Sequence, residues 1–241
     1  MDRGERIDKV MSMFDEHGID SYYRGILVHS LERCESLYPE TINRIKRALE
    51  ICDAGGFAFS LYSRLRGDNS SIPEGVNGDL VLTTFLGKLE QVRLVAEGIM
   101  NKARKAGLNV KFGRLSFLAH QPFPALIVGD AKGKLFWTVL EPEGKSLEVR
   151  YIQGIECRKL NKEPDNAMLF RLQEALKSMG YPKLRDGVFN DICGLSRGRF
   201  NQVHYTSPRA DRSFHADHGP FHALVRRLGL TKTPRRATRV L

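Results

Sequence analysis

The sequence predicts an α+β protein with a helical N-terminal region, an antiparallel β-meander in the middle and a basic, helical C-terminal domain. Three observations support this expectation. Apolar residues recur every three or four positions through about the first hundred residues, which is typical of amphipathic helices. Between about residues 110 and 157 the pattern changes to short apolar runs separated by turn-forming residues. The helical period then returns, together with most of the excess positive charge.

The N-terminal region is expected to be a series of helices. In the first of them, Ile7, Val10, Met11 and Phe14 fall on one face. The predicted helices span residues 2–17, about 21–37, 39–52 and about 79–106. Residues 57–66 are apolar and aromatic, and the sequence leaves their conformation open.

The middle of the chain is expected to form the meander. The predicted strands span residues 110–118, 125–128, 135–140 and 147–157. Short turns connect the last three strands, so these neighbours should be antiparallel. The polar residues 161–165 are the best candidate for a domain boundary. We therefore expect an α+β core at 1–160, which mediates dimerisation or partner binding, and a nucleic-acid-binding domain at 161–241.

The positive charge is concentrated near the end of the sequence. The net charge is +10, and residues 183–241 carry 12 Lys and Arg against 4 Asp and Glu, a balance of +8. A concentrated basic surface attracts polyanions through counterion release, which favours nucleic acid as the partner. A solvated basic surface without a ligand is the alternative.

Several other classes of protein are disfavoured. No apolar stretch reaches the length of a membrane-spanning helix, so no membrane partner is expected. The first residues lack the apolar segment of a secretory signal, which makes the cytoplasm the expected compartment. Cysteines occur at positions 34, 52, 157 and 193, in no zinc-binding pattern, and are expected to be free thiols.

Residues 186–205 resemble the helix-turn-helix motif of DNA-binding proteins. Gly194 could form the turn, and apolar residues at 189, 193, 195, 200 and 203 could form the small shared core. The resemblance implies a second helix whose outward side chains bind duplex DNA, namely Ser196, Arg197, Arg199, Asn201, Gln202 and Tyr205. Arg197 and Asn201 are the first choices for base contact, because they lie near the start of that helix. An ordinary αα-hairpin with a glycine turn is the alternative.

The segment after residue 218 adds further basic residues. A last helix is expected to begin at 219–220 and to carry Arg226 and Arg227 on its outer side. Residues 231–239 are expected to form a flexible basic tail. Such tails follow phosphates without a fixed fold, so Arg235 and Arg236 complete the predicted nucleic-acid-binding set.

Two residue groups could instead indicate an enzyme. His215, His218 and His222 lie close together and are candidate metal ligands, although Pro220 interrupts any continuous helix through them. Asp130 with Glu143-x-Lys145 has the residue order of many metal-dependent nucleases. The predicted turns place these two carboxylates at opposite ends of a strand, too far apart for one metal. We therefore assign no catalytic residues, no metal and no cofactor.

The sequence thus predicts a DNA-binding protein, either a transcriptional regulator or a replication or partition factor of a bacterium, phage or plasmid. The chain is expected to act as a homodimer or within a larger protein assembly. Two alternatives stay open. One is an RNA-binding or nucleoprotein-assembly component. The other is a metal-dependent nuclease that uses the C-terminal histidines.

Overall fold

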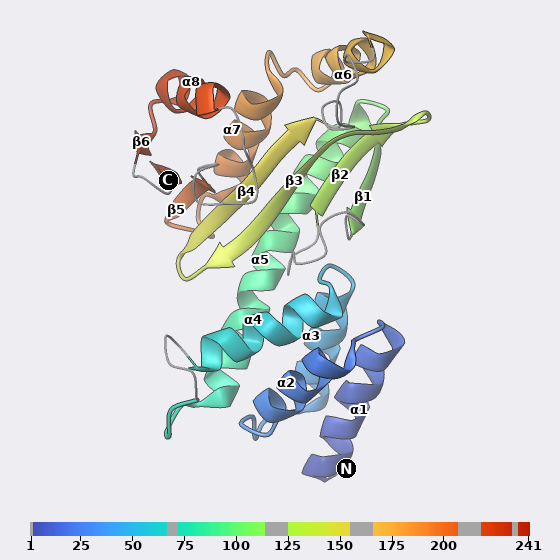
Figure 1. The fold of residues 1–241 in the computed structure, drawn as a ribbon, viewed down its shortest axis with the longest axis vertical. Coiled ribbons are helices and arrows are strands. Elements are labelled where there is room, and N and C mark those ends of the chain that lie inside the picture. Colours follow the sequence, from blue (N-terminus) through green and yellow to red (C-terminus); the bar gives the residue numbers. More distant parts are fainter. Residues whose placement is uncertain (1, 67–71, 114–124, 155–165, 207–217, 233–235) are drawn as a thin grey trace. The chain divides into compact units, whose positions relative to one another are not determined.

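The fold is described from a computed structural model (Figure 1), which describes residues 2–66, 72–113, 125–154, 166–206, 218–232 and 236–241. These residues divide into two compact units. Unit 1 extends to Gln91 and unit 2 begins at Val92, so the boundary falls within one long helix. The predicted domain boundary at 161–165 lies outside the described residues.

Unit 1 is helical, as the periodicity of the N-terminal region predicted. It contains α1 (Arg3–Glu16), α2 (Ser21–Leu31), α3 (Pro39–Leu49), α4 (Ala54–Arg66) and the first part of α5 (Gly78–Lys105). Asp2 and Glu5 form a capping box at the start of α1, and Asp20 caps α2 through the Tyr23 amide. The stretch that the sequence left open is therefore helical, since α4 covers it.

The centre of unit 1 is built from aromatic rings of three helices. Phe14 of α1 lies edge-on to Phe57 of α4, with ring centroids 5.3 Å apart. Phe57 in turn lies 5.1 Å from Phe85 of α5. All three side chains are almost completely buried, and their packing joins helices that are distant in the sequence.

Unit 2 is built on a seven-stranded sheet. Its strands are β1 (Asn109–Gly113), β2 (Ala125–Asp130), β3 (Gly133–Glu143), β4 (Ser146–Gly154), β5 (Gln202–Thr206), β6 (Thr231–Lys232) and β7 (Arg236–Val240), in the order β1-β2-β3-β4-β5-β7-β6. The hairpins β2–β3 and β3–β4 are antiparallel, as predicted for the meander. Strand β5 runs parallel to β4 and antiparallel to β7. The remaining helices are α6 (Asn166–Ser178), α7 (Leu184–Ser196) and α8 (His218–Leu228).

The predicted fold class is therefore wrong in its C-terminal part. That region is not a separate helical domain, because β5, β6 and β7 extend the sheet that the meander begins. The tail predicted to be flexible contains β7, in which Ala237 is fully buried. The physical reason is that Val203 and Tyr205 alternate with polar neighbours and find hydrogen-bonding partners in β4 and β7, more than thirty positions away.

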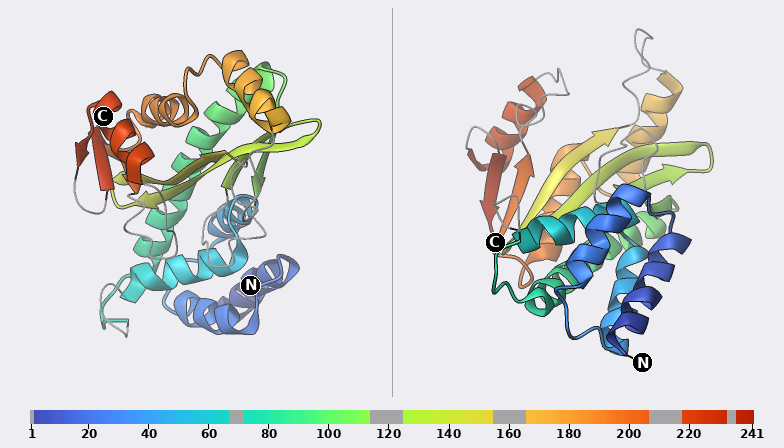
Figure 2. Two further views of the ribbon diagram at one scale, coloured as in Figure 1. Left: turned by 45° about the horizontal axis from the view of Figure 1, so that its top comes forward. Right: turned by 60° about the horizontal axis from the view of Figure 1, so that its bottom comes forward.

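The second part of α5 and helix α7 pack on one face of the sheet (Figures 1 and 2). Unit 2 has one apolar core, to which its helices, its strands and the segment after α8 all contribute. The core includes Val95, Ile99, Leu126, Val128, Leu147, Val149, Phe189, Ile192, Val203 and Leu224. Two helices approach their neighbours at glycines. A Cβ atom at Gly98 would lie 2.5 Å from the Leu195 side chain, and one at Gly187 would lie 2.3 Å from the Tyr181 ring. The absence of a side chain at these positions is therefore a packing requirement.

Candidate nucleic-acid interface

The segment predicted to be a DNA-reading helix is a turn followed by a strand. Helix α7 continues through Gly194 and ends at Ser196, and the backbone of Arg197 leaves the helix with φ −57° and ψ 135°. The turn glycine is Gly198, with φ +73°. The second helix implied by the helix-turn-helix resemblance is thus absent, because residues 202–206 pair in the sheet as β5. Gly194, predicted as the turn, instead adopts a helical conformation within α7.

Two residues of the predicted interface lie inside unit 2. Ser196 is fully buried at the end of α7. Tyr205 is also buried, and its ring lies perpendicular to that of Phe189, with centroids 5.9 Å apart. Burial raises the pKa of Tyr205. Gln202 is half-buried at the start of β5.

Two predicted arginines are engaged by carboxylates. Arg227 of α8 donates two hydrogen bonds of 2.7 Å to Asp186 of α7, and these bonds raise the pKa of Arg227. Arg236 of β7 donates to Glu143 of β3 at 2.5 Å, and that bond likewise raises the pKa of Arg236. Both pairs connect elements far apart in the sequence. Arg226 is exposed, and Arg235 lies outside the described residues.

The remaining predicted residues are exposed together in the turn between α7 and β5. Arg197, Arg199 and Asn201 all face solvent. The amides of Arg199 and Phe200 both donate to the Ser196 carbonyl at 3.0 Å, which makes the turn tight. The buried Phe200 side chain anchors this turn to the core.

A fourth polar residue joins them from a distant part of the chain. The Asn201 amide donates a 2.9 Å hydrogen bond to the carbonyl of Lys145, which lies in the tip of the β3–β4 hairpin. Lys145 is exposed. The sequence placed Lys145 only in a nuclease-like pattern. Its position beside β5 depends on the parallel pairing of β4 with β5, which no local pattern reveals. We call Lys145, Arg197, Arg199 and Asn201 the basic turn.

The basic turn is locally rich in uncompensated positive charge. Within the part of the chain that the structure describes, Lys145, Arg197 and Arg199 form no ion pair with a carboxylate. Arg199 donates one hydrogen bond of 3.0 Å to the Leu195 carbonyl, which leaves its other donors to solvent. The nearby Glu143 is already bonded to Arg236. Three exposed cations from two distant segments therefore lie in the neighbourhood of this turn.

Of the three histidines predicted as candidate metal ligands, only His222 has a side chain that the structure describes. His222 of α8 lies 3.1 Å from the ammonium of Lys232, a neighbour that would repel a metal ion. His215 lies outside the described residues, and only the backbone of His218 is described. Across the described part of the chain, no three His, Cys, Asp or Glu side chains are placed to hold a metal.

A fourth histidine, His204, lies on the sheet face opposite α7. Its Nδ1 is 2.8 Å from the Thr238 hydroxyl of β7. Burial and the charge of Arg236 lower the pKa of His204, and the carboxylates of Glu143 and Glu148 only partly offset this effect. The ring is therefore neutral at physiological pH.

The nuclease-like residue order does not produce a site either. Asp130 pairs with Gly133 at the start of β3, and Glu143 is the last residue of that eleven-residue strand. At about 3.3 Å per residue they are roughly 30 Å apart. Asp130 accepts hydrogen bonds from Arg171 of α6, and these lower its pKa to about 2. Its role in the structure is thus to tie α6 to the sheet.

Comparisons with known proteins give no relative from which a function could be transferred. No family model, no curated protein and no solved structure matches the chain. Among the helices of the described ranges, none combines the length and apolar character needed to cross a membrane. Any proposal of function therefore depends on the chemistry of the surface itself.

Proposed function

We propose that this protein binds nucleic acid and that the basic turn contacts the phosphate backbone. The observation that carries the proposal is the meeting of Lys145, Arg197 and Arg199, which come from two distant segments and form no ion pair among the described residues. Guanidinium and ammonium groups bind phosphate through charge-assisted hydrogen bonds. The net charge of +10 would assist the encounter.

The proposed mode of binding is backbone contact. A tight turn presents few side chains at once, so it suits phosphates better than a row of base edges. Asn201 adds an amide that can donate to a phosphate oxygen. Duplex DNA is the favoured partner, because its two strands place one negative charge about every 1.7 Å along the axis. Dimerisation and a cytoplasmic location, both expected from the sequence, remain part of this proposal.

The test is fluorescence anisotropy of the full chain with a labelled DNA duplex across a salt series. The variant carries Lys145→Gln, Arg197→Gln and Arg199→Gln together. Each lost phosphate contact should reduce the slope of log K against log salt by about 0.9, so the triple variant should lose about 2.7. Lys134→Gln is the matched control, since Lys134 is exposed at the opposite end of β3.

The outcomes separate the proposal from its alternatives. A reduced slope in the triple variant, with Lys134→Gln unchanged, supports binding through the basic turn. The same result with single-stranded RNA, at a slope of about 0.7 per contact, would assign the surface to single strands instead of duplexes. The proposal fails if the wild-type chain binds neither duplex nor single strand at low salt, or if the triple variant binds as the wild type does.

A further inference from the structure

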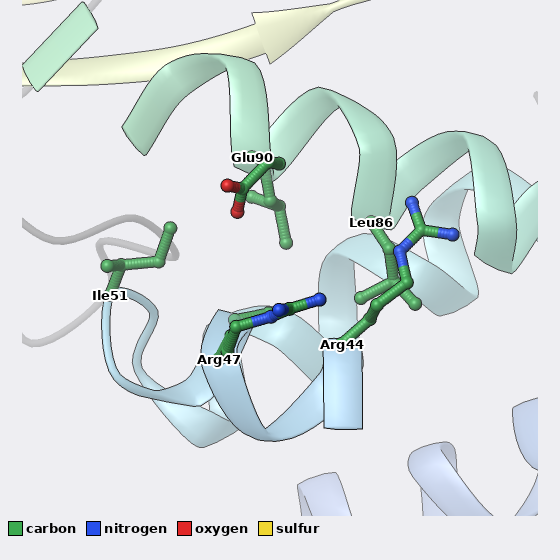
Figure 3. Close-up of a pocket in the computed structure, with 7 residues that line it drawn as sticks. Arg44, Arg47, Ile51, Leu86 and Glu90 are labelled. Carbon is green, nitrogen blue, oxygen red and sulfur yellow. The ribbon is translucent and has the colours of Figure 1, made fainter. Parts of the chain in front are cut away.

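Unit 1 contains a pocket between α3 and α5, lined by no residue of the basic turn (Figure 3). Its volume is about 120 Å³, and it opens to solvent. The residues that line it are Arg44, Arg47, Ala48, Ile51, Leu86, Leu89 and Glu90. Figure 3 shows both arginines coming from α3 and Glu90 coming from α5. The pocket therefore combines two cations, one carboxylate and an apolar floor.

The two arginines are the distinctive feature of this pocket. Arg44 and Arg47 are three positions apart in α3, so they lie on the same side of the helix. Like charges at this spacing repel each other unless an anion lies between them. Among the described residues, Arg47 has no hydrogen-bond or ion-pair partner. Arg44 has a single weak bond, 3.5 Å long, to the Thr83 carbonyl.

The floor of the pocket strengthens the effect of these charges. Ala48, Leu86 and Leu89 are almost completely buried, so the inner wall contributes little polarity. Electrostatic attraction is stronger beside such an apolar wall than in bulk water. Glu90 supplies only one carboxylate against two guanidinium groups, which leaves the pocket with a positive balance.

The size and donor arrangement indicate a particular kind of anion. A volume of about 120 Å³ corresponds to roughly four water molecules, which is the scale of a single phosphate group. A carboxylate has two oxygens and a single negative charge, so it would neutralise only one of the two guanidinium groups. A phosphate has further oxygens and a charge near −2 at neutral pH, so it can bond both arginines and neutralise them.

We propose that this pocket binds the phosphate group of a small molecule, held by Arg44 and Arg47 over the apolar floor formed by α3 and α5. The rest of the ligand would extend through the opening into solvent, because the pocket has room for little more than the phosphate. Free phosphate and a phosphate monoester share this chemistry. The site lies in unit 1 and involves no residue of the basic turn, so it does not depend on the proposed function.

The experiment is calorimetric titration of the full chain with inorganic phosphate and, separately, with a nucleoside 5′-monophosphate. Arg47→Gln should weaken binding by about tenfold or more, because a charge-assisted bond is lost. Lys46→Gln is the matched control, since Lys46 is exposed in the same helix but does not line the pocket. Binding of phosphate should also weaken between pH 7.5 and pH 5.5, as the anion loses charge below its second pKa of about 6.

A second variant keeps the test independent of arginine removal. A Cβ atom at Gly87 would lie 3.6 Å from Nη2 of Arg44, an ordinary contact distance. Gly87→Asp should therefore present an internal carboxylate to Arg44 and abolish phosphate binding without unfolding the protein. Tighter binding of the monophosphate than of phosphate assigns the site to phosphate monoesters, and equal binding assigns it to free phosphate. Absence of binding by both ligands, or binding that Arg47→Gln and Gly87→Asp leave unchanged, overturns the proposal.

Discussion

Two glycines of helix α7 should respond in opposite ways to substitution by alanine. Gly187→Ala would place a Cβ atom 2.3 to 2.7 Å from three atoms of Tyr181, whereas a Cβ atom at Gly194 would meet nothing within 4 Å. Tyr181 has little freedom to move, because its hydroxyl donates to Asp191 at 2.6 Å and Lys102 lies over its ring. The same substitution at two positions of one helix thus separates two effects. At Gly187 the steric cost of the new methyl group should dominate, and at Gly194 only the gain in helix propensity should remain.

The magnitudes follow from these distances. Alanine in place of a helical glycine gains about 1 kcal/mol of helix propensity. Overpacking a buried site costs about 1–3 kcal/mol, and the short contacts at Gly187 favour the upper end. Gly187→Ala should therefore destabilise the protein by about 1–2 kcal/mol. Gly194→Ala lies near the end of the helix and should stabilise it by about 0.5–1 kcal/mol.

The assay is urea denaturation followed by the fluorescence of Trp137. This residue is the chain's one tryptophan, and it is buried in β3 of unit 2, so its signal reports the unit that contains α7. The two alanine variants should differ by about 1.5–3 kcal/mol in their free energy of unfolding. In a Tyr181→Leu background the penalty of Gly187→Ala should shrink, because the ring that causes it is gone. Equal stability of the two alanine variants would refute this account of the close approach.

Three further predictions concern titration and thiol reactivity. His204→Gln should flatten the pH dependence of stability. Below pH about 6.5 the histidine takes up a proton more readily in the unfolded chain than in the folded protein, so the wild type becomes less stable as the pH decreases. Urea denaturation at pH 8 and at pH 5.5 would measure this difference. Asp130→Asn should remove a stabilisation that is present above pH about 4 and lost as the pH falls towards 2, as circular dichroism across an acid titration would detect. In a Cys157→Ser variant, a thiol reagent at pH 8 should label the native protein slowly and three thiols rapidly after unfolding. The described cysteines are buried, and burial raises the pKa of Cys34 to about 12 and of Cys193 to about 11; fast labelling before unfolding would contradict this expectation.

Local patterns were sufficient to predict helices α1, α2, α3 and α5 and the β2–β4 meander, but they left the conformation of the α4 segment open. Helix starts such as Asp2 and Pro39 are defined by neighbours within one turn, and hairpins are defined by the turns that join them. The segment after α7 could not be assigned in this way. Phe200 and Val203 fit a helical spacing, whereas Val203 and Tyr205 fit a strand. The partners that favour the strand lie in β4 and β7, which no local pattern reveals.

The same difference explains what could be predicted of the candidate interface. The polarity of Arg197, Arg199 and Asn201 was enough to predict that they are exposed. Charged and amide side chains face solvent in a turn just as they do on the outer face of a helix. The inward position of Tyr205 follows from the two-residue period of a strand, so a helical assumption placed it on the wrong face. Lys145 joins these residues only through the fold, since the hairpin tip reaches the turn once β4 and β5 pair.

The parallel pairing of β4 with β5 also determines the order in which the sheet can assemble. Glu148 pairs with His204, fifty-six positions later, whereas the strands of each hairpin close over a few residues. Closing a long loop has a larger entropic cost than closing a short one, and contacts of high sequence separation form slowly. The hairpins should therefore form within microseconds, and the docking of α7 and β5 should follow more slowly. Until β5 pairs with β4, the β4 edge would have unpaired amides and carbonyls, so we expect aggregation during refolding to be greatest before this pairing forms.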